Sequence, residues 1–172
     1  MNDTVTPANG QDLLDSSRWR PLWQMLQAMD QDIAALYAQA GMAEIRPRLV
    51  GPLIQLGRHG PMTIQELATR IEVTHSAMSQ TAAALRKADL VADAETTDRR
   101  TRRIRLSARA RELLPFLEAE WRATEATVRD LEREIPYPLS QVVQDILVAL
   151  ARQPFRERLQ DNLAKALDGH LE

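Results

Sequence analysis

Apolar residues recur every three or four positions over most of this chain, which is the spacing of amphipathic helices. A polar start over residues 1–16 lacks this periodicity, and we expect it to be a flexible tail. Beyond it the pattern predicts two helices before the central region and three after it: 17–41, 44–56, 107–135, 139–152 and a last one following Pro154. The chain is therefore predicted to be mostly α-helical.

Prolines and glycines modify two of these helices. Gly51 and Pro52 fall in the middle of the second helix, where they predict a kink or a break, because proline lacks an N–H and clashes with the preceding turn. Residues 57–61 are predicted to form a turn. Pro115 is predicted to kink the long helix near its start.

The central region, Thr63 to Ser107, has a different organisation. Thr63 followed three positions later by Glu66 predicts a capping box, in which each side chain bonds the backbone N–H of the other residue. A short helix is expected to follow, and a second helix to start near Thr74 and end near Lys87. The predicted inward stripe of this second helix is Val73, Ala77, Met78, Thr81 and Leu85, and the outward residues are His75, Ser76, Ser79, Gln80 and Ala83.

A two-stranded ribbon is predicted after the second helix. Leu90 to Ala92 should form one strand and Arg102 to Leu106 the other, with a polar loop between them. In the second strand Ile104 and Leu106 alternate with Arg103 and Arg105, so that one side packs on the helices and the other faces solvent or phosphate. The alternative for Arg103 and Arg105 is that they tie the ribbon to nearby acids. The fold class is thus predicted to be mainly α with a small β-wing (α+β): a winged helix-turn-helix between long flanking helices.

Composition restricts the chemistry. The 172 residues contain no cysteine, which excludes a disulfide, a thiol nucleophile or a cysteine-based metal site. The chain begins without a recognisable secretory signal and has no apolar run near the roughly 20 residues that span a bilayer, so we expect a cytoplasmic protein without a membrane partner. His59, His75 and His170 are scattered, and no catalytic motif is present, so neither an enzyme nor a metal or cofactor site is expected.

Charge is distributed unevenly and points to DNA. The net charge is only −2, yet seven arginines stand between Asp98 and Arg111 against one acid. A basic ribbon beside a helix with small polar side chains is typical of a module that binds double-stranded DNA. The expected contacts from the second helix are Thr74, His75, Ser76, Ser79 and Gln80, and those from the wing are Asp98, Arg99, Arg100 and Arg102. The alternative is that these residues form an ordinary solvated surface.

The flanking helices predict a homodimer. In the long helix Leu117, Trp121, Thr124, Val128, Leu131 and Ile135 step alternately by four and three, a seam suited to another helix. Together with the first helix, this apolar surface exceeds what one chain needs to cover. The alternative is that the helices fold back on their own chain.

The sequence resembles the MarR family of winged-helix transcription regulators over roughly Trp19 to Ile135. The likeness is most specific in GPMTIQELA, VTHSAMSQTAAALRKADLV and DRRTRRIRLSARA, within 60–110. It implies a single MarR-like domain over 17–172, in which 57–106 is the DNA-binding lobe and 17–56 and 107–172 are dimerisation helices. It also implies that wings enter minor grooves, with Asp98 steadying Arg100.

The chain departs from the family pattern at four positions. Gln80 and Ala84 stand where many members carry arginine, so we expect fewer phosphate contacts from the recognition helix. Glu72 and Ala110 stand where glycine is usual, in the motif turn and after the wing. The C-terminal segment beyond about Gln153 is longer than the family minimum.

The resemblance further implies a small-molecule cleft between the dimer helices and the DNA-binding lobe. Trp19 and Trp23, with Arg46 and Arg58, are the residues expected to hold an aromatic or anionic effector. The sequence therefore predicts a ligand-responsive repressor that binds a pseudo-palindromic operator as a homodimer. The competing prediction is a dimeric protein-interaction module whose arginine ribbon docks an acidic partner.

Overall fold

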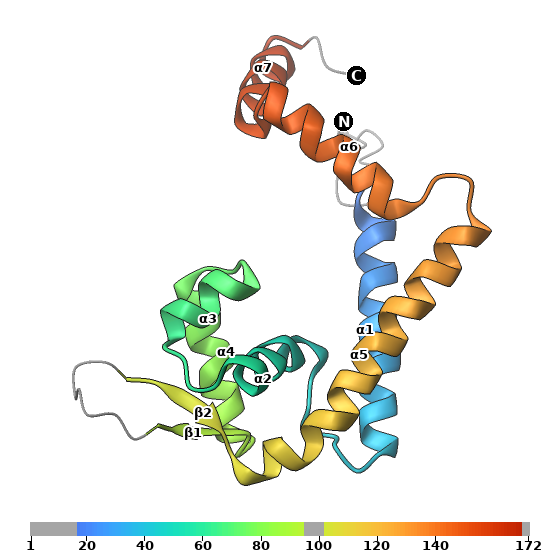
Figure 1. Cartoon of the computed structure of the whole chain (residues 1–172). Coiled ribbons are helices and arrows are strands. Elements are labelled where there is room, and N and C mark those ends of the chain that lie inside the picture. Colours follow the sequence, from blue (N-terminus) through green and yellow to red (C-terminus); the bar gives the residue numbers. More distant parts are fainter. Residues whose placement is uncertain (1–16, 95–101, 170–172) are drawn as a thin grey trace, which may run out of the picture. The chain divides into compact units, whose positions relative to one another are not determined.

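The computed structural model describes residues 17–94 and 102–169. Its contacts divide the chain into one unit that ends at Glu118 and a second that begins at Ala119. The described elements are α1 Arg20–Gln39, α2 Pro47–His59, α3 Ile64–Ile71, α4 His75–Lys87, β1 Val91–Asp93, β2 Ile104–Leu106, α5 Ala108–Glu134, α6 Leu139–Arg152 and α7 Phe155–Leu167 (Figure 1). The predicted fold class, mainly α with a small β-wing, is confirmed.

Helix α2 runs without a break through Pro52, so the predicted break is wrong, whereas the alternative of a kink stays a prediction. A proline inside a helix costs about 3 kcal/mol, because one hydrogen bond is lost and the ring crowds the preceding turn. Here Pro52 is itself buried with five other residues of the helix, and this burial offsets the cost. The helix also continues to His59, which shortens the predicted turn to Gly60 and Pro61.

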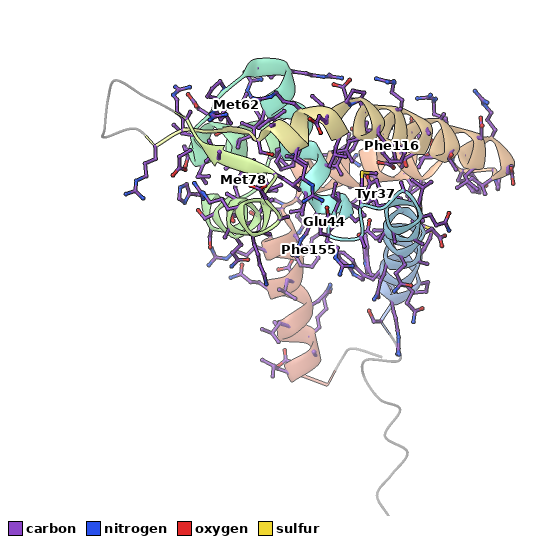
Figure 2. All side chains as sticks on the ribbon, turned by 90° about the horizontal axis from the view of Figure 1, so that it is seen from below. Tyr37, Glu44, Met62, Met78, Phe116 and Phe155 are labelled. Carbon is purple, nitrogen blue, oxygen red and sulfur yellow. The ribbon has the colours of Figure 1, made fainter. Side chains whose placement is uncertain are left out.

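The core of the first unit is formed by the helices around the ribbon. Its largest fully buried side chains come from α1 to α5, β2 and the loops between the elements, and they include Tyr37, Ile45, Leu49, Leu53, Leu67, Met78, Leu85, Leu90, Ile104 and Leu117. Tyr37 of α1 meets Phe116 of α5 edge to face, with 6.5 Å between the ring centroids (Figure 2). This contact joins the two long helices to the core of the lobe.

The ribbon is antiparallel, and Ala92 pairs with Arg105 at its centre. A third segment extends it, because Met62 exchanges two backbone hydrogen bonds with Ile104, at 3.0 and 2.8 Å. Ile104 and Leu106 are buried, whereas Arg103 and Arg105 are half-buried, so the predicted alternation is confirmed. Strand β2 is therefore bonded on one side to β1 and on the other to Met62, just before α3.

The second unit contains the end of α5 together with α6 and α7. Ser140, at the start of α6, donates to Glu132 from both its backbone N–H and its hydroxyl. Arg158 of α7 donates to the carbonyls of Ala149 and Gln153, which joins α7 to the end of α6. Neither α6 nor α7 contains a buried residue in the single chain, although both carry many apolar side chains. Among residues 17–94 and 102–169, no helix is long and apolar enough to cross a bilayer.

Candidate nucleic-acid interface

Helix α3 begins with the predicted capping box. The Glu66 backbone N–H donates to the Thr63 hydroxyl at 3.1 Å, and the Thr63 backbone N–H donates to Glu66 Oε2 at 2.8 Å. The bond from the Thr63 backbone and that from its hydroxyl, together with Arg103, lower the pKa of Glu66 below its usual value, although desolvation opposes them. The carboxylate of Glu66 is therefore charged at neutral pH.

The turn between α3 and α4 depends on a left-handed residue. Glu72 has φ 60° and ψ 39°, a conformation that glycine adopts without strain and other residues adopt at a cost. The Val73 N–H then bonds the carbonyl of Ala68 at 3.0 Å, which closes the end of α3. The turn thus has the backbone that glycine usually provides, with glutamate in its place.

Helix α4 presents small side chains to solvent. Thr74 caps it by accepting from the Ala77 N–H at 3.2 Å. The buried stripe is Met78, Ala82 and Leu85, at i, i+4 and i+7. The exposed residues on and just before the helix include Thr74, His75, Ser76, Ala77, Gln80 and Ala83.

Two predictions for this stripe are wrong. Val73 is 41% exposed and Ala77 is also exposed, whereas Ala82, which the pattern did not assign inward, is fully buried. The helix begins after its cap at Thr74, so Val73 precedes the helical register. Ser79 is half-buried, and its hydroxyl lies 3.5 Å from His75 Nδ1. The exposed face of α4 therefore includes Ala77 together with the predicted outward residues His75, Ser76, Gln80 and Ala83.

The far end of α4 is fixed by the start of α5. Ser107 donates its N–H to the Leu90 carbonyl and its hydroxyl to the Asp89 carbonyl, at 3.0 and 2.8 Å. The same hydroxyl accepts from the Ala110 N–H at 3.0 Å, so Ser107 caps the start of the long helix. Arg109 adds a bond to the Ala88 carbonyl at 3.1 Å and an ion pair with Glu44.

Ion pairs tie both strands of the ribbon to the helices. Arg86 of α4 pairs with Asp93 of β1 at 3.0 Å. Arg103, just before β2, donates to Glu66 Oε1 and to the Pro61 carbonyl, both at 2.9 Å. The expectation that an arginine of this strand ties the ribbon to a nearby acid is therefore confirmed for Arg103.

The predicted wing contacts are described only in part. Arg102 is exposed, and no ion pair involves it within the described chain. Asp98, Arg99 and Arg100 lie outside the described residues, so their predicted contacts stay predictions.

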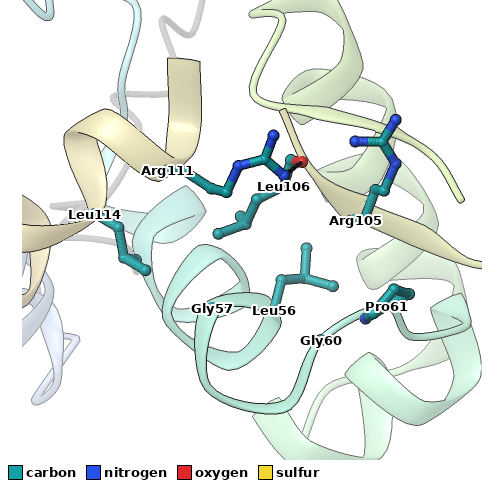
Figure 3. Close-up of a pocket in the computed structure, with 8 residues that line it drawn as sticks. All are labelled: Leu56, Gly57, Gly60, Pro61, Arg105, Leu106, Arg111 and Leu114. Atoms are coloured by element: carbon teal, nitrogen blue, oxygen red, sulfur yellow. Dashed lines mark hydrogen bonds between the residues drawn. The ribbon is translucent and has the colours of Figure 1, made fainter. Parts of the chain in front are cut away.

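A pocket of about 380 Å³ lies between the end of α2, β2 and the first turns of α5 (Figure 3). Its lining combines two arginines, Arg105 and Arg111, with Leu56, Gly57, Gly60, Pro61, Leu106 and Leu114. Arg111 also donates to the Leu106 carbonyl at 3.3 Å. The pocket therefore combines a mostly apolar lining with two positively charged side chains, a combination that the sequence analysis did not identify.

The four residues predicted for an effector cleft are not part of this pocket. Trp19 and Trp23 are 52% and 66% exposed at the start of α1. Arg46 is the exposed residue that precedes α2, and Arg58 lies 3.7 Å from Glu118 of α5. Their assignment to an effector cleft stays a prediction.

A helix, a left-handed turn, a second helix with a small-residue face and a two-stranded ribbon define a winged helix-turn-helix. Domains of this class are a common DNA-binding module. Residues 53–103 match the sequence model of the MarR family, which confirms the resemblance for the DNA-binding lobe. No curated protein matches the chain.

Solved structures agree on the fold. The transcriptional regulator SlyA has a TM-score of 0.56 at 14% identity, covering 87% of this chain and 95% of the other. MepR of S. aureus, in complex with DNA, has a TM-score of 0.54 at 17% identity, covering 90% and 99%. A SlyA-like transcription regulator of Listeria monocytogenes has a TM-score of 0.53 at 11% identity, covering 91% and 97%. At these identities the likeness establishes the fold.

Proposed function

We infer that this regulator binds double-stranded DNA as a homodimer, with α4 in the major groove and the ribbon beside it. The exposed face of α4 is the observation that carries the inference. Ser76, Ala77 and Ala83 have small side chains, so that the helix backbone approaches base edges closely beside the longer exposed side chains of His75 and Gln80. Gln80 is the side chain best suited to read a base, since its amide pairs with adenine. MepR, which shares the fold, has been solved in complex with DNA, and this supports the proposal of DNA binding.

The homodimer accounts for the exposed apolar side chains outside the lobe. Trp121, Leu131 and Ile135 of the predicted seam are 45 to 47% exposed in the single chain. A second copy is the occupant expected for a two-fold regulator, because recognition helices one helical turn apart then meet successive half-sites of a pseudo-palindrome. Repression follows when the operator overlaps a promoter.

Ligand response completes the proposal. The pocket lined by Arg105 and Arg111 lies beside β2 and α5, so a bound anion there would alter the packing of the ribbon against the long helix. A ligand that binds one packing of the ribbon more tightly than the other shifts the protein toward that packing. The resulting change in DNA affinity is limited by the difference between the ligand's affinities for the two packings. The expected tryptophan and arginine cleft of Trp19, Trp23, Arg46 and Arg58 remains the second candidate for the effector.

Selection from a genomic library with the purified full-length chain tests the DNA-binding proposal. We expect one or a few fragments to be bound at least about 10³-fold more tightly than bulk DNA. The competing function, a module that docks an acidic protein through its arginines, predicts no preferred fragment. Enrichment of no sequence over bulk DNA would therefore reject the operator proposal.

A further inference from the structure

Two neighbouring arginines at the start of β2 have different surroundings. Arg102 is exposed and has no ion pair among the described residues. Arg103 uses both of its terminal nitrogens, one on Glu66 Oε1 and one on the Pro61 carbonyl, each at 2.9 Å. A guanidinium whose charge is already balanced by a carboxylate is a poor partner for phosphate, because the carboxylate repels the phosphate oxygens. Arg102 is therefore suited to contact phosphate, and Arg103 is suited to hold the ribbon in place.

The partners of Arg103 are themselves held in place. Glu66 bonds the Thr63 backbone through its other oxygen, Oε2, and so belongs to the capping box of α3. Next to this contact, Met62 and Ile104 exchange two backbone hydrogen bonds. Arg103 thus links the second strand of the ribbon to the cap of α3 through the carboxylate of Glu66.

We propose that Arg103 is a positioning residue, which fixes β2 against α3 through Glu66 and Pro61 and thereby sets where Arg102 meets DNA, without binding DNA itself. The proposal rests on the DNA-binding function inferred above. It assigns to Glu66 a task beyond helix capping: the acid strengthens DNA binding although its own charge repels DNA. That sign is opposite to the one that simple electrostatics predicts, which makes the proposal testable.

The first experiment compares two exchanges that remove the same negative charge from the same lobe. Glu66→Gln keeps a residue type that supports a capping box but loses the ion pair with Arg103. We expect it to weaken binding to the selected fragment about three- to tenfold, the fold-change that corresponds to the net contribution of one ordinary hydrogen bond. The matched control, Glu72→Gln, changes an exposed acid in the motif turn, and we expect unchanged or tighter binding. Equal tightening by both variants would overturn the proposal.

The second experiment separates positioning from phosphate contact through the salt dependence of affinity. Loss of one phosphate contact lowers the slope of log K against log salt by about 0.9. We expect this change for Arg102→Gln, whereas Arg103→Gln should weaken binding about as much as Glu66→Gln and leave the slope unchanged. Arg103→Lys keeps the charge but not both bonds, and it should not restore the affinity. A reduced slope for Arg103→Gln that Lys restores would show phosphate contact instead.

A measurement without DNA tests the positioning role of Arg103 separately from the proposed DNA-binding function. Hydrogen exchange of the Met62 and Ile104 amides reports the junction between the ribbon and α3 directly. We expect faster exchange at both amides in Arg103→Gln and Glu66→Gln, and parent-like exchange in Arg102→Gln. Unchanged exchange in the first two variants would refute the positioning role even if the parent binds its operator. A parent that selects no DNA, with the expected exchange pattern, would refute the DNA-binding function and leave the structural connection in place.

Discussion

At the scale of single residues, the turn between α3 and α4 stores strain at Glu72. Its φ of 60° places the backbone in the left-handed region, and this conformation costs a residue other than glycine about 1–2 kcal/mol. We expect Glu72→Gly to raise the free energy of unfolding by about 0.5–1 kcal/mol, after the entropy cost of glycine in the unfolded chain. Urea denaturation of the full-length protein measures this change. Glu72→Ala is the control, since it removes the carboxylate and keeps Cβ. If the Glu72→Ala variant were more stable than the Glu72→Gly variant, backbone strain at this position would not be the cause.

A second residue-scale prediction concerns Glu66 and pH. Because its pKa is lowered in the folded chain, chiefly by the Thr63 backbone N–H, the folded state favours the charged form. Its stabilising contribution is then complete at neutral pH and is lost as the pH falls through the folded pKa. We expect the parent to be more stable than Glu66→Gln near pH 7 and the difference to shrink in acid. Thermal unfolding of both proteins across the acidic range checks this, and a constant difference would argue against it.

At the scale of elements, α2 and α5 approach each other closely at Gly57. A Cβ built at this position would lie 2.4 Å from Leu114 Cδ2, so the leucine would have to move. We expect Gly57→Ala to destabilise the protein by less than about 1 kcal/mol, because the cost of overpacking against the flexible Leu114 is partly offset by the 0.5–1 kcal/mol, roughly, that alanine gains over glycine inside a helix. The same exchange in a Leu114→Ala background should cost less, and equal costs in both backgrounds would show that this contact is not the cause.

Most elements could be predicted from the sequence because their signals are local. The capping box at Thr63, the cap at Ser107 and the alternation around Ile104 each depend on residues a few positions apart. The helix through Pro52 could not be predicted, because its stability comes from burial against residues distant in sequence.

The candidate site divides in the same way. The exposed polar residues of α4 follow from helical periodicity, and the tie between Arg103 and an acid was one of two open alternatives. The Arg109–Glu44 pair joins residues 65 positions apart, and neither carries a local motif. The pocket beside Arg105 and Arg111 likewise gathers three separate segments. Such contacts require the tertiary structure.

At the scale of the whole molecule, the proposed homodimer depends on apolar side chains that the single chain leaves exposed. Leu131 is 47% exposed and belongs to the predicted seam of α5. We expect Leu131→Glu to weaken self-association at least about tenfold, because a buried carboxylate without a partner is costly. Sedimentation at micromolar concentration measures this. Ala119→Glu is the control and should remain associated, because Ala119 is exposed on the side of the same helix that faces away from the seam. A monomeric parent would refute the homodimer.

Ser107 has a consequence for how this protein tolerates sequence change. Its single hydroxyl caps α5 and also holds the Asp89 carbonyl, while its backbone N–H holds Leu90. Threonine supplies the same hydroxyl, whereas asparagine and aspartate cap a helix but carry no hydroxyl to serve both bonds at once. In a library that randomises this codon and is selected for function, Ser107 should therefore accept threonine and little else, although nothing about its half-exposed position suggests such narrow tolerance.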